Sequence, residues 1–298
     1  MSGAIFAADV LAGKRILITG GGTGLGRAVA GRLAEHGAVV HLWGRREAVL
    51  EEAAAEISSR TPGRAHFQAV DVRDAEQVDA AVQAIFDDHG PLTGLINNAA
   101  ANFIAPTASI SARAFQAVTS TVMNGSFHTT HACGRRWIEA GIKGSVVSTL
   151  TTWIWSGSAF VTPSAMAKAA VHSMTMSLAV EWGRYGIRLN AIAAGPIPTD
   201  YAWEMLNPTD KSSVGATQSD AVPMQRFGTI EELANLNIFL LSDACDYLTG
   251  AAIAMDGGQH LAGPGTFAGL TGLSDEDWAE ARERSQTASA AAKAQRSV

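Results

Sequence analysis

The glycine-rich stretch Thr19–Gly26, which reads Thr-Gly-Gly-Gly-Thr-Gly-Leu-Gly, constrains the fold of this chain most strongly. It follows the apolar run Arg15–Ile18 and precedes Leu25, Val29 and Leu33 at helical spacing, so it predicts a turn between a strand and a helix. Glycine permits close approach of the backbone, and a helix N-terminus attracts phosphate. We expect a bound nucleotide here, with a ligand-free glycine turn as the alternative. The residues expected to line it are Gly20, Thr23, Gly24, Leu25 and Gly26.

Strand-like and helix-like stretches alternate along the chain, and this alternation predicts a parallel sheet covered on both faces through right-handed crossovers. Since no linker interrupts the pattern, we expect one Rossmann-type, doubly wound α/β domain with a core over residues 13–258 and an extension over residues 259–298. The predicted strands are Arg15–Ile18, Ala38–Leu42, His66–Val70, Gly94–Asn97, Ser145–Ser148, Arg188–Ile192 and Ala252–Met255. The predicted helices are Arg46–Ser58, Asp74–Asp88, Ala112–Ala140 with a break near Gly125, Ser164–Trp182 and Glu231–Leu241.

Two long segments, Leu150–Pro163 and Gly195–Gly228, have no clear periodicity. Each follows a predicted strand, and ligands of open α/β sheets bind beyond the carboxyl ends of the strands, so we expect both segments to border the site. Near the end of the chain, Ser274–Asp277 resembles a helix start of the capping-box kind. The Ala/Ser/Lys/Gln-rich segment Gln286–Val298 is expected to fray.

Composition excludes several classes of function. The net charge of −6 argues against nucleic acid as the main partner, and no apolar run is long enough for a membrane span. Cys133 and Cys245 form no pair motif, which together with the lack of a secretory signal predicts a reducing, cytoplasmic location. His128 and His131 share one helical face without an evident third ligand, so we expect a packed or subunit-facing helix and no metal site.

The second predicted strand bears on the choice of nucleotide. An NAD-binding fold usually places an acidic residue after this strand to hold the ribose 2′-hydroxyl, whereas this chain has Arg45 and Arg46 there. Two guanidinium groups suit a 2′-phosphate, which favours NADP(H) over NAD. The alternative is a solvated pair at the start of a helix, where cations oppose the dipole. Asp71, after the third strand, is a candidate acceptor for the adenine amino group, and Val72 would pack against the ring.

Together with the glycine turn, four further motifs resemble the short-chain dehydrogenase/reductase superfamily over about residues 13–258: Asn97-Asn98-Ala99-Ala100, Asn124, Lys168 and Gly195-Pro196-Ile197-x-Thr199. The resemblance implies a nicotinamide cofactor and a homotetramer. It implies that Lys168 binds the nicotinamide ribose. Residues that it places along the rest of the cofactor are Asn98, Ala99, Ala100, Gly195, Pro196, Ile197 and Thr199.

The chain departs from the usual pattern at the proton donor. Most members place a tyrosine four residues before the lysine, and this position holds Ser164, while Thr151 stands at the position of their catalytic serine. Serine in place of tyrosine resembles one branch, the NADPH-dependent 2,4-dienoyl-CoA reductases. In that branch an asparagine matching Asn102 and a tyrosine matching Trp153 hydrogen-bond the thioester oxygen. The resemblance extends to Ser164 and Lys168, whereas Trp153 replaces the tyrosine.

The chemistry of the residues agrees with this branch. Reduction of a ketone needs a proton donor for the alkoxide, and the chain offers no tyrosine near Lys168. Reduction of a double bond conjugated to a thioester spreads charge into an enolate, which needs oriented donors of the oxyanion-hole kind. The amide of Asn102 and the indole N–H of Trp153 are such donors, and the proton can come from water.

Alternatives remain at each of these positions. Asn102 could cap its own loop, Trp153 could be an aromatic wall beside Trp155, and Ser164 could cap the helix that carries Lys168. The predicted function is NADPH-dependent reduction of an enoyl or dienoyl thioester. The alternatives are a ketoreductase or alcohol dehydrogenase with a rearranged donor such as Tyr201, and a non-catalytic cofactor-binding protein. Retention of Lys168 and Asn124 argues against the last, because a scaffold needs neither.

Overall fold

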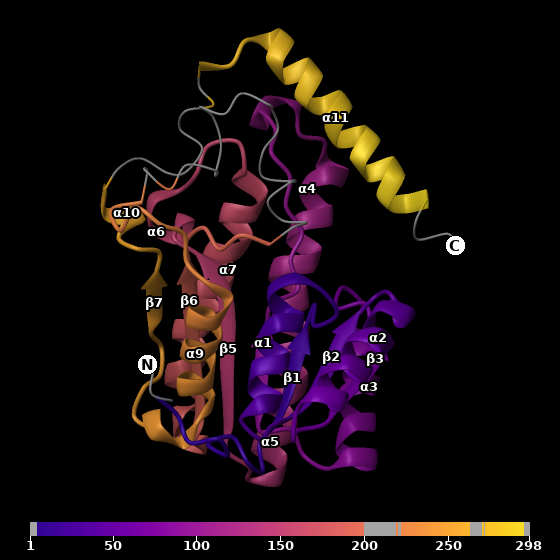
Figure 1. The fold of residues 1–298 in the computed structure, drawn as a ribbon, viewed down its shortest axis with the longest axis vertical. Coiled ribbons are helices and arrows are strands. Elements are labelled where there is room, and N and C mark those ends of the chain that lie inside the picture. The colour runs from indigo at the N-terminus through magenta and orange to yellow at the C-terminus, as the bar shows by residue number, and fades with distance from the viewer. Residues whose placement is uncertain (1–4, 200–218, 220–221, 263–269, 271, 295–298) are drawn as a thin grey trace.

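The computed structural model describes residues 5–199, 219, 222–262, 270 and 272–294. Its centre is a parallel sheet of seven strands in the order β3-β2-β1-β4-β5-β6-β7 (Figure 1). The predicted doubly wound fold is therefore confirmed, with strand ends shifted by a few residues. The strands are β1 (Arg15–Thr19), β2 (Val39–Gly44), β3 (Ala65–Ala69), β4 (Gly94–Asn97), β5 (Gly144–Thr151), β6 (Ile187–Ala194) and β7 (Ala252–Met255).

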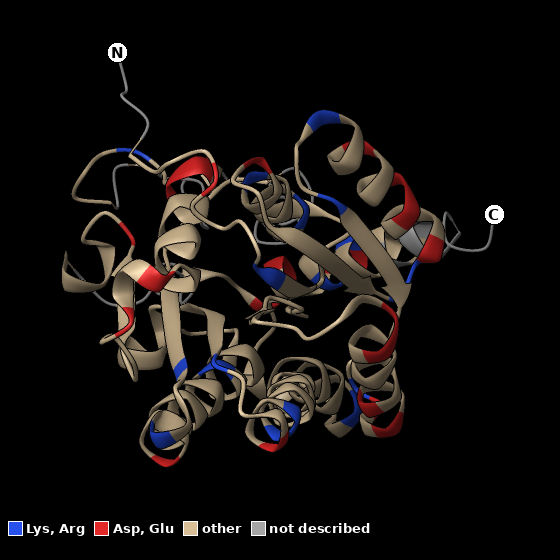
Figure 2. Cartoon of the chain, turned by 90° about the horizontal axis from the view of Figure 1, so that it is seen from below, with Lys and Arg blue, Asp and Glu red and all other residues tan. Residues whose placement is uncertain are grey.

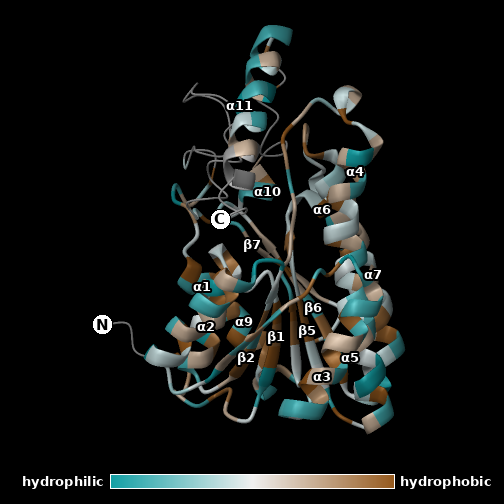
Figure 3. Ribbon diagram, turned by 90° about the vertical axis from the view of Figure 1, so that its right-hand side faces the viewer, coloured by the Kyte–Doolittle hydropathy of each residue, from teal (hydrophilic) through white to brown (hydrophobic). Residues whose placement is uncertain are grey.

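Helices cover both faces of the sheet (Figure 3). Buried side chains of α1, α2 and α9 form one core with the sheet, and those of α3 and α5 form a second core on the opposite face. The longer helices are α1 (Gly24–Glu35), α2 (Glu47–Arg60), α3 (Ala75–His89), α4 (Ala112–Thr119), α5 (Gly125–Ala140), α7 (Thr162–Trp182), α9 (Ile230–Leu241) and α11 (Asp275–Ala294). Two of the described helices have four residues each, α6 (Trp153–Ser156) and α10 (Gln259–Ala262).

The strand sequences explain why the sheet is covered twice. In β1, Ile16 and Ile18 belong to the core under α1 and α9, whereas Leu17 belongs to the core under α3 and α5. Strands buried on both faces are continuous apolar runs, and this is the pattern of β1 and β4. Lys, Arg, Asp and Glu lie mostly on the outer helices and connecting loops (Figure 2). Among the described helices, none is long and apolar enough to cross a membrane.

Three segments differ from the sequence expectations or refine them. The predicted helix Ala112–Ala140 is interrupted by a π-helical turn, Ser120–Asn124, which agrees with the expected break near Gly125. Leu150–Pro163, expected to lack regular structure, instead gives its ends to β5 and α7 and contains α6, which is too short to produce a sequence period. Of Gly195–Gly228, residues 200–218 and 220–221 lie outside the described part, and Tyr201 is among them.

The C-terminal extension is more regular than expected. A capping box starts α11, because Ser274 N donates to Asp277 Oδ2 at 2.9 Å and Asp277 N donates to Ser274 Oγ at 3.2 Å. The expectation that the chain frays from Gln286 is wrong up to Ala294, where α11 ends. The abundant alanine of this segment has the highest intrinsic helix propensity of any residue, which favours continuation of the helix.

Candidate active site

The glycine turn forms a backbone cradle at the carboxyl end of β1. Gly20 has φ +68, and a Cβ on Gly26 would lie 2.2 Å from the Gly20 carbonyl oxygen, so neither position accepts another residue without displacement. Thr23 precedes α1, and its side chain makes no capping hydrogen bond. The first N–H groups of α1 are thus left for another acceptor, which fits the phosphate of a dinucleotide.

The turn after β4 is tied to this cradle at the point where the strand order reverses, between β1 and β4. Thr19 Oγ1 accepts hydrogen bonds from the backbone N–H groups of Asn98 and Ala99, both at 3.0 Å. Asn98 Nδ2 donates to the Thr19 carbonyl oxygen at 3.1 Å and the Gly20 carbonyl oxygen at 3.4 Å. The Asn98 side chain therefore holds the glycine turn in place, and Ala99 follows at the same crevice.

Positive charge gathers beyond β2 and β3. Arg45 and Arg46 are exposed and make no ion pair among the described residues. Asp71 accepts from Arg73 Nε at 2.8 and 3.0 Å, and this hydrogen bond, together with the charges of Arg73 and Arg45, lowers the pKa of Asp71. The carboxylate expected to face an adenine is thus already paired. Arg73, the partner of Asp71, was not singled out in the sequence, although its place two residues after Asp71 is a usable signal for this pairing.

The carboxyl end of β5 and the start of α7 bring the expected catalytic side chains together. Lys168 is buried, and its Nζ donates to the Thr149 carbonyl oxygen of β5. Burial lowers the pKa of Lys168 to about 8. Ser164 lies one helical turn earlier, is also buried, and donates its N–H to the Val161 carbonyl oxygen at 3.0 Å. The hydroxyl of Thr151 is buried without a hydrogen-bond partner among the described residues, which suits a polar ligand atom.

Asn102 is positioned by its neighbours. Ala101 and Phe103 pack with Ala167, the residue next to Lys168, in one apolar cluster. Asn102 itself is half-buried between them, so the turn after β4 holds it close to the start of α7.

The π-helical turn is held by the same cluster through Val122, and its last residue, Asn124, is exposed. Trp153 is half-buried at the start of α6, two residues after Thr151.

The segment after β6 closes back on the cradle. A Cβ on Gly195 would lie 2.6 Å from Asp256, and Gly228 N donates to the Pro196 carbonyl oxygen at 3.1 Å. Thr199 Oγ1 lies 4.0 Å from the position that a Cβ on Gly24 would occupy. The segment with Gly195, Pro196, Ile197 and Thr199 therefore does reach the glycine turn.

Val72, expected to pack against an adenine ring, is buried next to Gly125.

Two tyrosines lie away from this group of residues. Tyr185 ends the 3₁₀ turn Gly183–Tyr185 before β6, and Tyr247 is fully exposed before β7, so both precede a strand at the amino edge of the sheet. Neither is placed to act as a proton donor beside Lys168.

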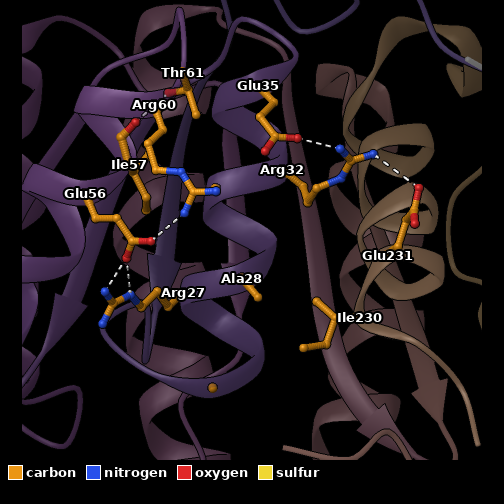
Figure 4. A pocket seen from close by; sticks show the side chains of 12 residues that line it. Arg27, Ala28, Arg32, Glu35, Glu56, Ile57, Arg60, Thr61, Ile230 and Glu231 are labelled. Carbon is orange, nitrogen blue, oxygen red and sulfur yellow. Dashed lines mark hydrogen bonds and ion pairs between the residues drawn. The ribbon is translucent and has the colours of Figure 1, made fainter.

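A cavity of about 490 Å³ lies between α1, α2 and α9, and its lining includes Gly24 of the glycine turn (Figure 4). Its charged walls pair with each other: Arg27 with Glu56, and Arg32 with Glu231 at 3.7 Å. Because these charges neutralise one another, we do not assign this cavity to the cofactor.

Within the described part of the chain, no group of three or more His, Cys, Asp or Glu side chains could hold a metal ion. The two histidines that share one face of α5, His128 and His131, contact other protein groups. His128 Nδ1 lies 3.0 Å from the Val72 carbonyl oxygen, and the His131 ring stacks on Phe127 with centroids 5.7 Å apart.

The fold and this site define a nucleotide-dependent oxidoreductase. A sequence profile of the family described as Enoyl-(Acyl carrier protein) reductase matches residues 20–260. The chain belongs to the short-chain dehydrogenase/reductase family, whose members bind NAD or NADP. It is therefore an oxidoreductase, as the glycine turn and Lys168 predicted.

Several relatives carry more specific names. The chain is 42% identical over 249 residues to a probable 2,4-dienoyl-CoA reductase [(2E)-enoyl-CoA-producing] of Bacillus subtilis, covering 83% of this chain and 97% of the relative. It is 35% identical over 269 residues to the peroxisomal 2,4-dienoyl-CoA reductase [(3E)-enoyl-CoA-producing] of Danio rerio, and the match covers 90% of this chain and 89% of the relative. A crystal structure of a short chain dehydrogenase from Bacillus anthracis matches with a TM-score of 0.75 and 40% identity. The match covers 85% of this chain and 98% of that structure's chain.

Proposed function

We propose that this chain reduces a conjugated carbon–carbon double bond in an enoyl or dienoyl thioester, with NADPH as the reductant. The observation that carries the proposal is the buried pair Ser164 and Lys168: the lysine of the family is kept and the tyrosine position holds serine. This pair suits a reaction that needs an oxyanion stabilised and no strong acid beside the lysine. The similarity to proteins named 2,4-dienoyl-CoA reductase supports the same substrate class.

The residues present fit a nicotinamide dinucleotide. The glycine cradle that a Cβ on Gly26 would fill, the uncapped start of α1 and the orphaned hydroxyl of Thr151 are features that a bound dinucleotide would satisfy. The bound cofactor supplies a hydride. Lys168 would hold the nicotinamide ribose, and Thr199 the nicotinamide end.

Asn102 and Trp153 would act on the thioester oxygen. When hydride adds to carbon, negative charge moves through the conjugated system to that oxygen and forms an enolate. The Asn102 amide, held half-buried beside the start of α7, would donate a hydrogen bond to it, and the indole of Trp153 would supply a second. Water would then protonate carbon, so the product gains one hydride and one proton.

The arginines after β2 support NADPH over NADH. Arg45 and Arg46 are exposed and make no ion pair among the described residues, whereas Arg73, after the neighbouring strand β3, is paired with Asp71. A 2′-phosphate brings two negative charges that the guanidinium groups of Arg45 and Arg46 would bind through charge-assisted hydrogen bonds.

We also propose a homotetramer in a reducing compartment such as the cytoplasm. Large apolar side chains are exposed along α5 and α7 and at the turn between α4 and α5, and an interface between copies would cover them. Both cysteines are free and buried. Light scattering on the purified protein tests the assembly, and a monomeric mass would contradict it. The exposed residues are Met123, Phe127, Met166, Met176 and Val180.

A substrate panel tests the reaction. Purified protein with NADPH is given 2,4-dienoyl-CoAs, 2-enoyl-CoAs and simple ketones, and consumption of NADPH is followed with product identification. We expect reduction of a conjugated thioester, with the remaining double bond at position 2 or 3 identified by mass spectrometry and NMR. Reduction of ketones alone would contradict the proposal and favour a ketoreductase.

A further inference from the structure

Phe160 has an unusual backbone conformation beside the proposed site. Its φ is +63, in the left-handed region that large side chains avoid, so the surrounding structure must hold it there. Two contacts do so. The Phe160 carbonyl oxygen accepts a hydrogen bond from Ala105 N at 2.9 Å, and the Phe160 ring lies against Trp278 with centroids 4.6 Å apart.

These contacts connect the C-terminal extension to both loops of the site. Trp278 is buried in an apolar cluster with Val161, and Ile104, Trp153 and Phe160 pack against the same cluster. Ile104 follows Asn102 by two residues. Trp153 is the proposed second donor, so the cluster includes one donor and adjoins the other.

The cluster also fixes the start of α7. Val161 is fully buried, and its carbonyl oxygen accepts hydrogen bonds from the N–H groups of Ser164 and Ala165, both at 3.0 Å. Lys168 follows one turn later. The strained loop at Phe160 therefore leads directly into the helix that carries the Ser164–Lys168 pair.

Among the described residues, the apolar contacts of α11 with the domain are made from its N-terminal half. Its capping box places Trp278 in the first turn. Trp278 and Ala281 are the buried ones among its described side chains, and residues 282–288 are exposed. Figure 1 and Figure 3 show α11 beyond the carboxyl edge of the sheet, on the side of the site. A helix held in this way stabilises the loops that it contacts more than the central core.

We propose that Trp278 is a positioning residue for the reductase reaction: through Phe160 it holds the loops of Asn102 and Trp153 and the start of α7 in their reactive arrangement. This inference rests on the proposed function for its substrate. The contacts that carry it, however, are independent of the substrate. The glycine cradle has no part in the cluster, so cofactor binding should not depend on Trp278.

The test compares Trp278→Ala with Trp278→Phe and with Arg282→Ala, which shortens an exposed side chain one turn further along α11. We expect Trp278→Ala to lower kcat for a 2,4-dienoyl-CoA by about 10- to 100-fold, as small misplacements of reacting groups do, with an unchanged Kd for NADPH. Trp278→Phe keeps an aromatic ring on Phe160 and should recover most of kcat, and Arg282→Ala should match the wild type.

Hydrogen exchange of the backbone supplies a second measurement that needs no substrate. We expect Trp278→Ala to speed exchange in residues 101–106 and 157–165 and to leave β1 and α1 unchanged. An unchanged kcat, unchanged exchange in those segments, or exchange accelerated equally throughout the molecule would overturn the inference. If the wild type reduces no conjugated thioester, the proposed function fails, and the exchange result alone then decides the positioning role.

Discussion

At the scale of single residues, Arg45 tests the choice of cofactor. It is exposed after β2 and has no ion pair among the described residues, so its guanidinium group is available to a 2′-phosphate. We expect Arg45→Ala to raise the Kd for NADPH about 10- to 100-fold, as loss of a charge-assisted hydrogen bond does, and to leave NADH nearly unchanged. Arg184→Ala, on an exposed arginine before β6, is the control. Equal weakening of both cofactors would rule out the assignment.

Variants of Lys168 and Ser164 test the separate roles of the two buried residues in cofactor binding and turnover. Because burial lowers the pKa of Lys168 to about 8, its positive charge is present at neutral pH and is lost as the pH rises through 8. We therefore expect the affinity for NADPH to fall between pH 7 and 9.5. The Lys168→Ala variant should bind NADPH weakly at every pH in that range. Ser164→Ala should reduce kcat only modestly. Complete loss of turnover in Ser164→Ala, with folding and NADPH affinity intact, would instead make the serine an essential acid or relay.

At the scale of elements, the loops after β4 and β5 test the oxyanion site. We expect Asn102→Ala to lower kcat about 10²- to 10³-fold without altering NADPH affinity, as loss of an oxyanion donor does. Trp153→Phe keeps the aromatic wall and removes the N–H. A large decrease in kcat would assign Trp153 as a donor, and little change would leave it as a wall. Trp153→Tyr should preserve or raise dienoyl-CoA reduction. Normal kcat in Asn102→Ala would refute the oxyanion role.

The elements also show what the sequence could predict. Strands such as β1 and β4 were predicted because burial on both faces leaves continuous apolar runs. The helix predicted over Ser164–Trp182 corresponds to α7, Thr162–Trp182, which carries Lys168. The short helix α6 was missed because four residues carry no period. The contact of Phe160 with Trp278 joins residues far apart in the chain, so no local pattern could indicate it.

At the scale of the whole molecule, a group of basic side chains couples stability to pH. The buried ring of His41 on β2 lies 5.0 Å from the ring of His66 and 5.1 Å from that of His89, and Arg15 Nη1 lies 3.4 Å from His41 Nε2. Burial, together with the charges of His66, Arg15 and His89, lowers the pKa of His41 to about 3. The folded state therefore resists a proton that the unfolded chain accepts near pH 6.5.

Since the pKa of His41 is depressed in the folded state, its contribution to stability is complete above pH 6.5 and is lost as the pH falls towards 3. Between pH 6.5 and 5 we expect the free energy of unfolding to fall by about 2 kcal/mol from His41 alone. Urea unfolding at pH 5 and pH 7 measures this decrease in the free energy of unfolding. Both pH values lie above the range in which Asp79 and Glu232, with pKa values of about 2, titrate. An equally steep decrease in His41→Gln would contradict this origin.

The transfer of deuterium from labelled NADPH to a 2,4-dienoyl-CoA distinguishes reduction of a conjugated thioester from reduction of a ketone. With deuterium at the transferring position of the nicotinamide, mass spectrometry of the product locates the label. We expect one deuterium on a carbon of the acyl chain, an intact thioester, and one further deuterium on carbon when the reaction runs in D₂O. An unlabelled, unreduced dienoyl-CoA beside a ketone that accepts the deuterium under the same conditions would contradict it.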